Sequence, residues 1–460
     1  MQLIGGQTHP LDLPEIRTTI ASFLTNRDRV SCMQVNQGWF RDFAGSVWHT
    51  IAFRTDHPFT QLPPATIAKY GHLVRSAFNV LKERDIFALS HKAINSLTTI
   101  GFHISNNALS RLHFFDVVRH NMASLVSIDL SALHITPDSV EEQREDAIYF
   151  TNIEMPMSGS KLESLHLCSL TLTRRNFSDI LQYSPRLTFV HIFGTILMSH
   201  NPSFELFQHQ GVKTLVASLD QVWVPDNQDL LTPTLLVHFP QLETWRDPAH
   251  SFPSPSIDKN DLRYELIYNC PHLVKVDFER ENSDPDEIGD MLANEFVRLE
   301  HCTFSYALLN RSSFVGLLEH QETLTHIVLT VPDRGTQPSA ADLNPSGSHL
   351  VGLILRCFRN LEVFSVEGHQ MHIAAAEEHA WVCGGLRELR MRFHELETVQ
   401  EVDSCLERLR DLRSIGGQGD LTTPDNGDGS IEHRVCLKLL PMRKLKTVWL
   451  GTKNCYLATP

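Results

Sequence analysis

One short apolar motif recurs along most of this chain and constrains its fold more than any other feature. The motif places apolar residues at its first, fourth and sixth positions, as in Leu162/Leu165/Leu167 and Leu386/Leu389/Met391. Its copies start roughly 25 to 37 residues apart, an interval typical of proteins built from stacked repeats. The copies start at Leu97, Leu125, Leu162, Leu187, Val212, Leu242, Leu273, Leu299, Leu324, Leu361, Leu386, Leu412 and Leu445.

Each copy ends with two apolar positions two residues apart, which is the period of a β-strand. Amphipathic helical stretches precede many copies, for example residues 180–183 and 405–408. This order of helix, turn and short strand resembles a leucine-rich repeat. The resemblance implies an α/β solenoid with parallel strands on its concave side and helices on its convex side. An ordinary α/β domain is the alternative, because the spacing is uneven and the Asn or Cys expected after each strand is missing.

Between the motif copies, three stretches have the composition of inserted loops, namely residues 249–256, 332–348 and 416–430. Residues 54–96 contain a turn-rich joint and a strand-like run, and we interpret them as a helical linker with a possible degenerate first repeat. Residues 97–460 are then predicted to form the irregular leucine-rich repeat domain.

The first fifty residues follow a different pattern, in which apolar residues four apart lie on one face of a helix. A unit of this size buries too little surface to be comfortably stable alone, so its apolar faces need a partner inside or outside the chain. The two series of apolar residues are Ile16, Ile20 and Leu24, and Val35, Trp39 and Phe43.

The order of residues in this segment is more specific than its helical period. Leu13-Pro14 precedes Glu15-Ile16, Val35 and Trp39 follow Asp28 by seven and eleven residues, and Val47-Trp48 closes the segment. This order resembles an F-box, through which substrate receptors of SCF-type ubiquitin ligases bind a Skp-family adaptor and, through it, a cullin. The resemblance covers about a tenth of the chain and implies a short three-helix F-box over residues 1–53. The adaptor-binding residues that it implies are Leu13, Pro14, Ile16, Ile20, Leu24, Val35, Trp39 and Trp48.

The two resemblances together predict a substrate-recognition subunit of an SCF-type ubiquitin ligase that binds its protein substrate through the repeats. Such a receptor has no catalytic residue, because the chemistry takes place on other subunits. A repeat scaffold whose F-box-like helices merely cap the solenoid is the alternative, and an enzyme is a third possibility. The sequence contains no HExxH or GxSxG motif, so we expect neither a catalytic centre nor a metal or cofactor site.

The charge and the cysteine content limit which binding partners and which cellular compartment we expect. The net charge is −14, and residues 1–53 are balanced, so the acidic excess lies in the rest of the chain. Such a balance disfavours nucleic acid as a partner, and no apolar run is long enough to indicate a membrane span. The nine cysteines include no CxxC pair, which favours free thiols in the cytoplasm or nucleus.

The residues that alternate with the apolar strand positions are expected to face the concave side. Near the C-terminus they form a basic and aromatic group that stands out in an acidic chain, and Arg and Trp are enriched at binding hot spots. We therefore expect an acidic or phosphorylated substrate segment to bind there, with solvated charges on an ordinary repeat face as the alternative. The predicted substrate-binding residues are Glu388, Arg390, Arg392, Lys446 and Trp449.

Overall fold

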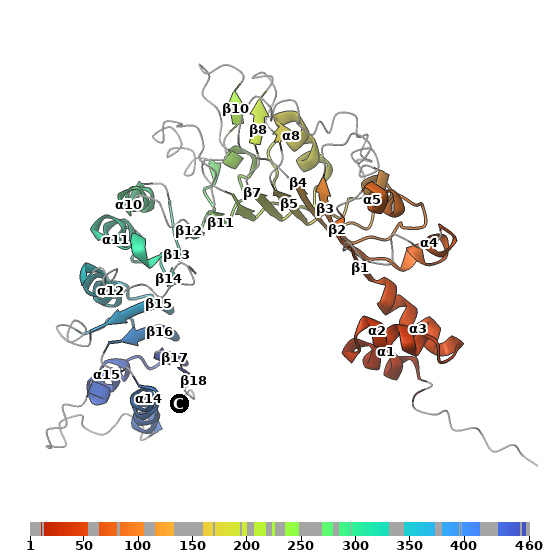
Figure 1. Ribbon diagram of the computed structural model, residues 1–460. Coiled ribbons are helices and arrows are strands. Elements are labelled where there is room, and N and C mark those ends of the chain that lie inside the picture. The colour runs from red at the N-terminus through yellow and green to blue at the C-terminus, as the bar shows by residue number, and fades with distance from the viewer. Residues whose placement is uncertain are drawn as a thin grey trace, which may run out of the picture. The chain divides into compact units, whose positions relative to one another are not determined.

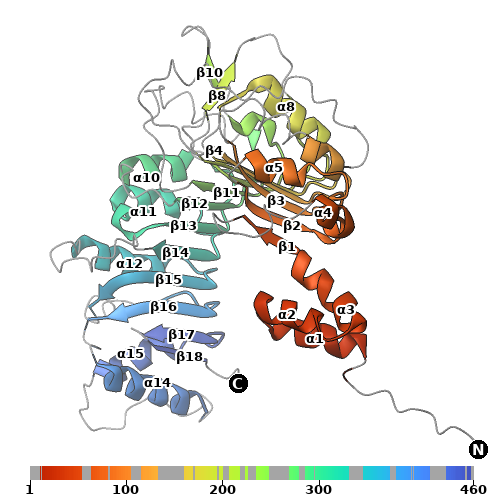
Figure 2. The same ribbon diagram turned by 45° about the vertical axis from the view of Figure 1, so that its right-hand side comes forward.

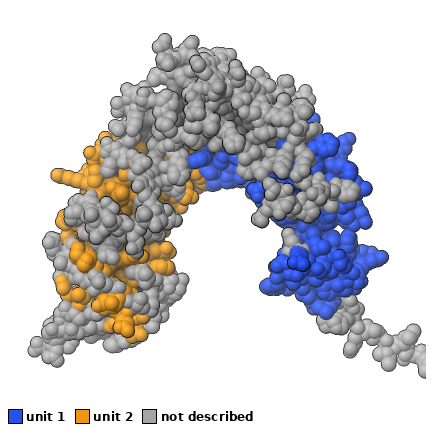
Figure 3. All heavy atoms as spheres, in the orientation of Figure 1, with its two compact units in different colours: residues 1–212, 221–235 blue, residues 213–220, 236–460 orange. Residues whose placement is uncertain are grey.

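The computed structural model divides the chain into two compact units, which Figure 3 shows in different colours. Unit 1 comprises residues 1–212 and 221–235, and unit 2 comprises residues 213–220 and 236–460. The structure describes residues 11, 13–53, 64–80, 83–104, 116–132, 160–168, 171–193, 196–199, 207–217, 223–225, 235–247, 269–278, 285–294, 296–330, 345–372, 380–394, 396, 398–414, 431–450 and 453–456.

Unit 1 begins with the helices α1 (Pro14–Phe23), α2 (Asn26–Met33) and α3 (Gln37–Trp48). Pro14 occupies the first turn of α1, where a backbone N–H is not needed. Asn36 caps α3 by accepting a hydrogen bond from the Trp39 N–H at 2.9 Å. This cap starts α3 at Gln37, so Val35, which we expected within the second helix, lies between α2 and α3.

Six parallel strands form the main sheet in the described part of unit 1, in the order of the sequence (Figure 1). Because β1 begins two residues after α3 ends, the three helices lead directly into this sheet. The strands are β1 (Thr50–Ala52), β2 (Ser76–Val80), β3 (Thr99–Ile104), β4 (Ser127–Ala132), β5 (Ser164–Cys168) and β7 (Phe189–Phe193). A smaller parallel sheet, absent from the sequence-based expectation, contains β6 (Thr171–Thr173), β8 (Ile196–Ser199) and β10 (Trp223–Pro225).

Unit 2 continues the same pattern with eight described parallel strands, and a ninth strand runs antiparallel to the last of them. The parallel strands are β9 (Thr214–Val216), β11 (Thr244–Asp247), β12 (Lys275–Phe278), β13 (His301–Ser305), β14 (His326–Thr330), β15 (Val363–Met371), β16 (Glu388–Phe393) and β17 (Thr447–Leu450). The reversed strand β18 (Lys453–Tyr456) pairs with β17.

Helices cover one face of the sheet in each unit, as Figure 2 shows most clearly for unit 2. We call the opposite face of each sheet its open face. Unit 1 contains α4 (Pro64–Tyr70), α5 (Glu83–Leu89) and α8 (Arg174–Tyr183), with the 3₁₀ turn η3 (Gly71–Leu73). Unit 2 contains α10 (Pro285–Asn294), α11 (Arg311–Leu318), α12 (Pro345–Cys357), α14 (Val399–Ser414) and α15 (Ile431–Leu439), with η5 (Tyr306–Leu308). The 3₁₀ turn η4 (Leu235–His238) lies where the two units meet in sequence.

The motif residues form the core between sheet and helices. In β5, for example, Leu165 and Leu167 are at most 1% exposed, whereas their neighbours Ser164 and His166 are half-buried on the open face. At nearly every strand start, two successive backbone N–H groups donate to one carbonyl of the previous repeat. This recurring bond holds neighbouring strands in one register, so each motif copy aligns with the next.

Twelve of the thirteen predicted copies begin with a buried residue and lead into a strand of these sheets. The copy at Leu412 is wrong, because Leu412 lies within α14. Buried Val402, Leu406 and Leu409 continue a helical period toward Leu412. The predicted loop at 332–348 is also too long, since α12 begins at Pro345. The predicted loops at 249–256 and 416–430 lie outside the described residues.

The sequence lacks the regular Asn or Cys that would connect neighbouring repeats, and three buried polar side chains make such connections instead. They stand three or four residues before a motif copy and bind the backbone of the previous repeat. Asn121 donates to the Ile94 carbonyl at 3.0 Å and accepts from the Leu97 N–H at 2.8 Å. His209 and His320 donate from Nε2 to the carbonyls of Ser184 and Leu292, at 2.9 and 2.8 Å.

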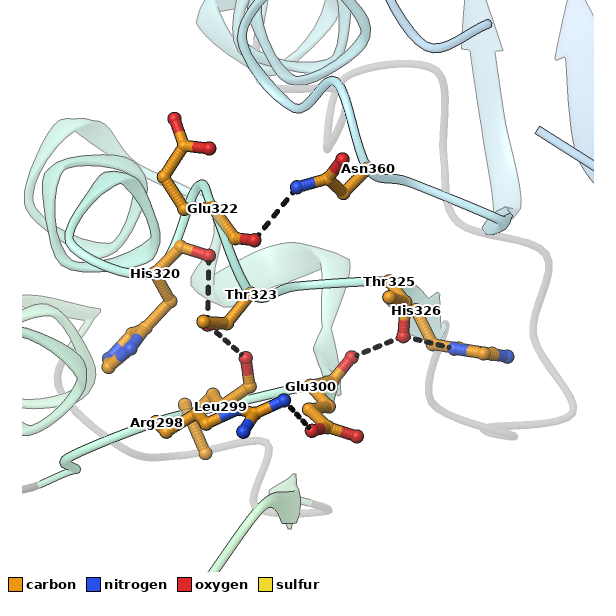
Figure 4. Close-up of polar contacts among 9 residues, drawn as sticks. All are labelled: Arg298, Leu299, Glu300, His320, Glu322, Thr323, Thr325, His326 and Asn360. Atoms are coloured by element: carbon orange, nitrogen blue, oxygen red, sulfur yellow. Dashed lines mark hydrogen bonds and ion pairs between the residues drawn. The ribbon is translucent and has the colours of Figure 1, made fainter. Parts of the chain in front are cut away.

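Threonine hydroxyls add a second set of bonds between repeats, which Figure 4 shows for β13 and β14. Thr323 donates to the Leu299 carbonyl at 2.6 Å, and Thr325 donates to the Glu300 carbonyl at 3.0 Å. These bonds connect neighbouring repeats without the regular side-chain ladder that the sequence lacks.

Candidate protein-docking surfaces

An ion pair and a few small or aromatic side chains form the interior of α1–α3. Arg17 is only 7% exposed, and its Nε lies 2.8 Å from a carboxylate oxygen of Asp42. Ala21, Phe43 and Ala44 are the other buried residues of the three helices. None of the four buried residues is one that the F-box resemblance assigns to an adaptor.

None of those eight residues belongs to the buried core. Leu13, Pro14 and Val35 are exposed, and the other five are half-buried. Two of the half-buried rings have partners within the chain, since Trp39 stacks on Phe43 and Trp48 stacks on Tyr70 of α4, each at 5.3 Å between ring centroids.

Sequence reasoning missed three further exposed apolar side chains on this surface. Phe23 is 84% exposed, Val30 is 44% exposed and Leu11 is 40% exposed. The position of Phe23, three residues after Ile20 on the same helix, was a signal that could have identified it. We call Leu11, Leu13, Ile16, Ile20, Phe23, Leu24, Val30 and Val35 together the apolar surface of α1–α3.

A hollow lies where these helices meet the sheet. Its volume is about 410 Å³, and it is lined by Arg29, Ser46, His49 and Thr50. Arg29 Nε donates to the Ala21 carbonyl at 2.8 Å. Through this hydrogen bond the guanidinium closes the end of α1.

Three of the five predicted substrate-binding residues lie side by side on the open face of unit 2, namely Glu388, Arg390 and Trp449. Parallel pairing of β16 with β17 places Arg390 opposite Trp449, and the Arg390 guanidinium lies over the Trp449 ring at 5.4 Å from its centroid. The carboxylate of Glu388 accepts a hydrogen bond from Arg390 Nε. Arg392 and Lys446 are exposed, and neither has an ion-pair partner among the described residues.

A pair of histidines lies on the same open face, on the neighbouring strands β13 and β14. The rings of His301 and His326 stack with centroids 3.9 Å apart. Since the Thr325 hydroxyl donates its proton to the Glu300 carbonyl, its oxygen accepts from His326 Nδ1 at 2.8 Å (Figure 4). His326 therefore carries its proton on Nδ1 when neutral, which leaves the lone pair on Nε2.

We expect both histidines to be neutral at pH 7. Burial lowers the pKa of each, and for His301 the neighbouring His326 and Lys275 lower it further. Replacing His326 with Phe keeps a stacked ring but removes a neighbour that can carry a positive charge. The pKa of His301 is therefore expected to rise toward its usual value. An NMR titration of the ring measures this, and an unchanged His301 pKa would contradict it. The pKa of both histidines is lower in the folded chain than the ordinary value of 6.5. The folded protein is therefore expected to lose stability as the pH falls below 6.5, because the unfolded chain binds these protons more readily.

A comparable histidine pair occupies the open face of unit 1, on the neighbouring strands β5 and β7. His166 and His191 approach at 3.2 Å between their Nδ1 atoms, and the Ser164 hydroxyl lies 3.0 Å from His166 Nε2. Burial lowers the pKa of His166, opposed by the charge of Asp129 on the adjacent strand. Within the described residues, no group of three His, Cys, Asp or Glu side chains is arranged to hold a metal ion.

The parallel strands, their common register and the helices on one face define an α/β fold of the leucine-rich repeat kind. No protein-family model matches the chain, and no curated protein matches it. Among solved structures, an internalin from Listeria monocytogenes is similar, with 11% sequence identity and a TM-score of 0.26. That match covers 73% of this chain and 91% of the internalin chain. Among the described helices, none is both long enough and apolar enough to span a membrane.

Proposed function

We propose that this chain is the substrate-recognition subunit of an SCF-type ubiquitin ligase. In this proposal α1–α3 bind a Skp-family adaptor, which links the chain to a cullin, and the repeats bind a protein substrate. The observation that supports this proposal best is the apolar surface of α1–α3, whose side chains are exposed or only half-buried. Apolar side chains such as Phe23, at 84% exposure, favour burial against a partner.

The mechanism that follows is proximity. The receptor would hold a substrate lysine near a ubiquitin-conjugating enzyme borne by other subunits, which raises the effective concentration of the reacting groups. This chain then needs no catalytic residue, cofactor or metal of its own. Such a complex would work in the cytoplasm or the nucleus, where free cysteines stay reduced.

Replacing Leu13 and Pro14 with Ala is expected to weaken binding of a Skp-family adaptor by roughly thirtyfold or more, because truncating a buried anchor commonly costs about 2 kcal/mol. Phe23→Ala, at a side chain that contributes little to the fold, should also weaken binding. Titration of the full chain with purified adaptor measures both effects.

The matched control is Thr18→Ala, since Thr18 is exposed on α1 but points to a different side of the helix from Ile16 and Ile20. Its affinity should stay within twofold of wild type. Wild-type affinity in both the Leu13/Pro14 and the Phe23 variants would reject the proposed docking surface.

A repeat scaffold that recruits no ligase is the second candidate, and one observation favours it. Phe40 and Trp48 of α3 both contact the ring of Tyr70 in α4, which ties the three helices to the following chain. Helices joined in this way can cap the array. A wild-type chain that fails to bind the adaptor at micromolar concentration would favour this scaffold.

A further inference from the structure

The last two parallel strands and their flanks carry positive charge in an acidic chain. Arg387, Arg390, Arg392, Lys444 and Lys446 are all exposed in or beside β16 and β17. The whole chain has a net charge of −14, so this cluster opposes the general trend. A local cluster of one sign attracts partners of the other sign and excludes partners of the same sign.

The guanidinium of Arg390 is held in one orientation by its neighbour. It lies over the face of Trp449, which is its register partner on β17. This cation–π contact restricts the rotamers of the long side chain that carries the N–H fork. A fork held in this way matches the geometry of a carboxylate or phosphate group and loses less entropy on binding.

One donor of this fork is already occupied. Arg390 Nε donates to Glu388, and the side chains are 44% and 28% exposed, respectively. Ion pairs with that much exposure contribute only about 0–1 kcal/mol, so an incoming oxyanion can replace the Glu388 carboxylate. Arg387 is engaged in a similar way by Glu362 at 3.2 Å. The cluster therefore contains both the binding groups and weak internal competitors.

We propose that the open face of β16 and β17 binds a peptide segment rich in carboxylate or phosphate groups, and that Glu388 competes with that segment for Arg390. Arg390 and Arg392 contact the oxyanions, and Trp449 positions Arg390. This assignment rests on the proposed function only in treating the segment as part of a substrate. Peptide binding itself does not require the adaptor.

Fluorescence anisotropy of labelled peptides with the full chain tests this proposal. The probes are an Asp/Glu decapeptide, a decapeptide with two phosphoserines among neutral residues, and an Asn/Gln decapeptide of the same length. At least one oxyanion peptide should bind tenfold more tightly than the amide peptide, and the stronger of the two identifies the source of the charge. Equal binding of all three peptides would overturn the proposal.

Arg390→Glu with Arg392→Glu should reduce oxyanion-peptide binding at least tenfold. The matched control is Arg311→Glu with Arg359→Glu, which makes the same change in charge at exposed positions that begin α11 and follow α12. Binding by the control should stay within twofold of wild type. Equal losses in both double variants would reduce the effect to net charge and reject a site at β16–β17.

Glu388→Gln distinguishes a competitor from a structural support. If Glu388 competes for Arg390, the variant should bind the oxyanion peptide three- to tenfold more tightly than wild type. If Glu388 instead holds Arg390 in its binding position, the variant binds more weakly and the competitor role is wrong. Adaptor affinity, measured on the same variants, should not change, so failure of this proposal and failure of the ligase proposal give different results.

Discussion

Replacing Trp245 with Ala is expected to destabilise unit 2 by about 3–5 kcal/mol, since removing a large buried ring costs both its transfer free energy and a cavity. Trp245 is 1% exposed, and its ring lies perpendicular to that of Phe278 with 5.5 Å between centroids. Its indole N–H also donates to the Ala217 carbonyl at 2.8 Å, so Ala leaves that carbonyl without this donor. Urea unfolding of the full chain, followed by hydrogen exchange, measures the loss.

Trp245→Phe is the matched control, because it keeps an aromatic ring and removes only the hydrogen bond and part of the volume. It should cost less than Ala, on the order of 1–2 kcal/mol. In a repeat array each unit touches only its neighbours, so fast exchange after Trp245→Ala should concentrate in β9, β11 and β12. A uniform loss of protection across unit 2 would indicate one cooperative core instead.

Replacing Gly316 with Ala should cost about 3 kcal/mol, because α10 and α11 touch through their glycines. A Cβ added at Gly316 would overlap the Gly289 carbonyl oxygen and lie 2.8 Å from Leu292 Cβ. Relief requires the helix backbones to move apart, and overpacking of this kind costs about 1–3 kcal/mol or more. Thermal or urea unfolding of the full chain compares the variant with wild type.

Gly384→Ala serves as the control, because a Cβ added there meets no atom within 4 Å. Its effect should be within about 1 kcal/mol and can be stabilising, since Ala restricts the unfolded chain. If Gly316→Ala is as mild as Gly384→Ala, the close approach of α10 and α11 is not needed for stability.

The candidate sites could be predicted only in part. The apolar surface of α1–α3 was largely predictable, because residues such as Ile16 and Ile20 are too apolar for so small a unit and share a helix face. The ion pair of Arg17 with Asp42 was not, since nothing in the local sequence distinguishes a buried arginine from a solvated one. Similarly, the sequence grouped Glu388 with the binding residues, whereas the structure pairs it with Arg390.

The repeated strand was determined by the sequence itself. Apolar residues at the first, fourth and sixth positions favour burial, and a turn that leads into a strand places all three on the covered side of the sheet. Twelve buried motif starts, from Leu97 to Leu445, follow from that preference. Because the Asn or Cys expected after each strand is missing, the sequence did not indicate which side chains would bond neighbouring repeats. Only the structure showed that Asn121, His209 and His320 do so.

Which strands become neighbours was decided by tertiary structure. The motif at Leu412 predicts a strand between β16 and β17, which would separate Arg390 from Trp449. The segment instead continues as α14, because its buried residues Val402, Leu406 and Leu409 keep a helical period and pack as a helix. With no strand inserted, β17 pairs directly with β16 and brings Arg390 onto Trp449. A single segment cannot encode this pairing, because the free energy that decides between helix and strand at Leu412 comes from contacts with the rest of unit 2.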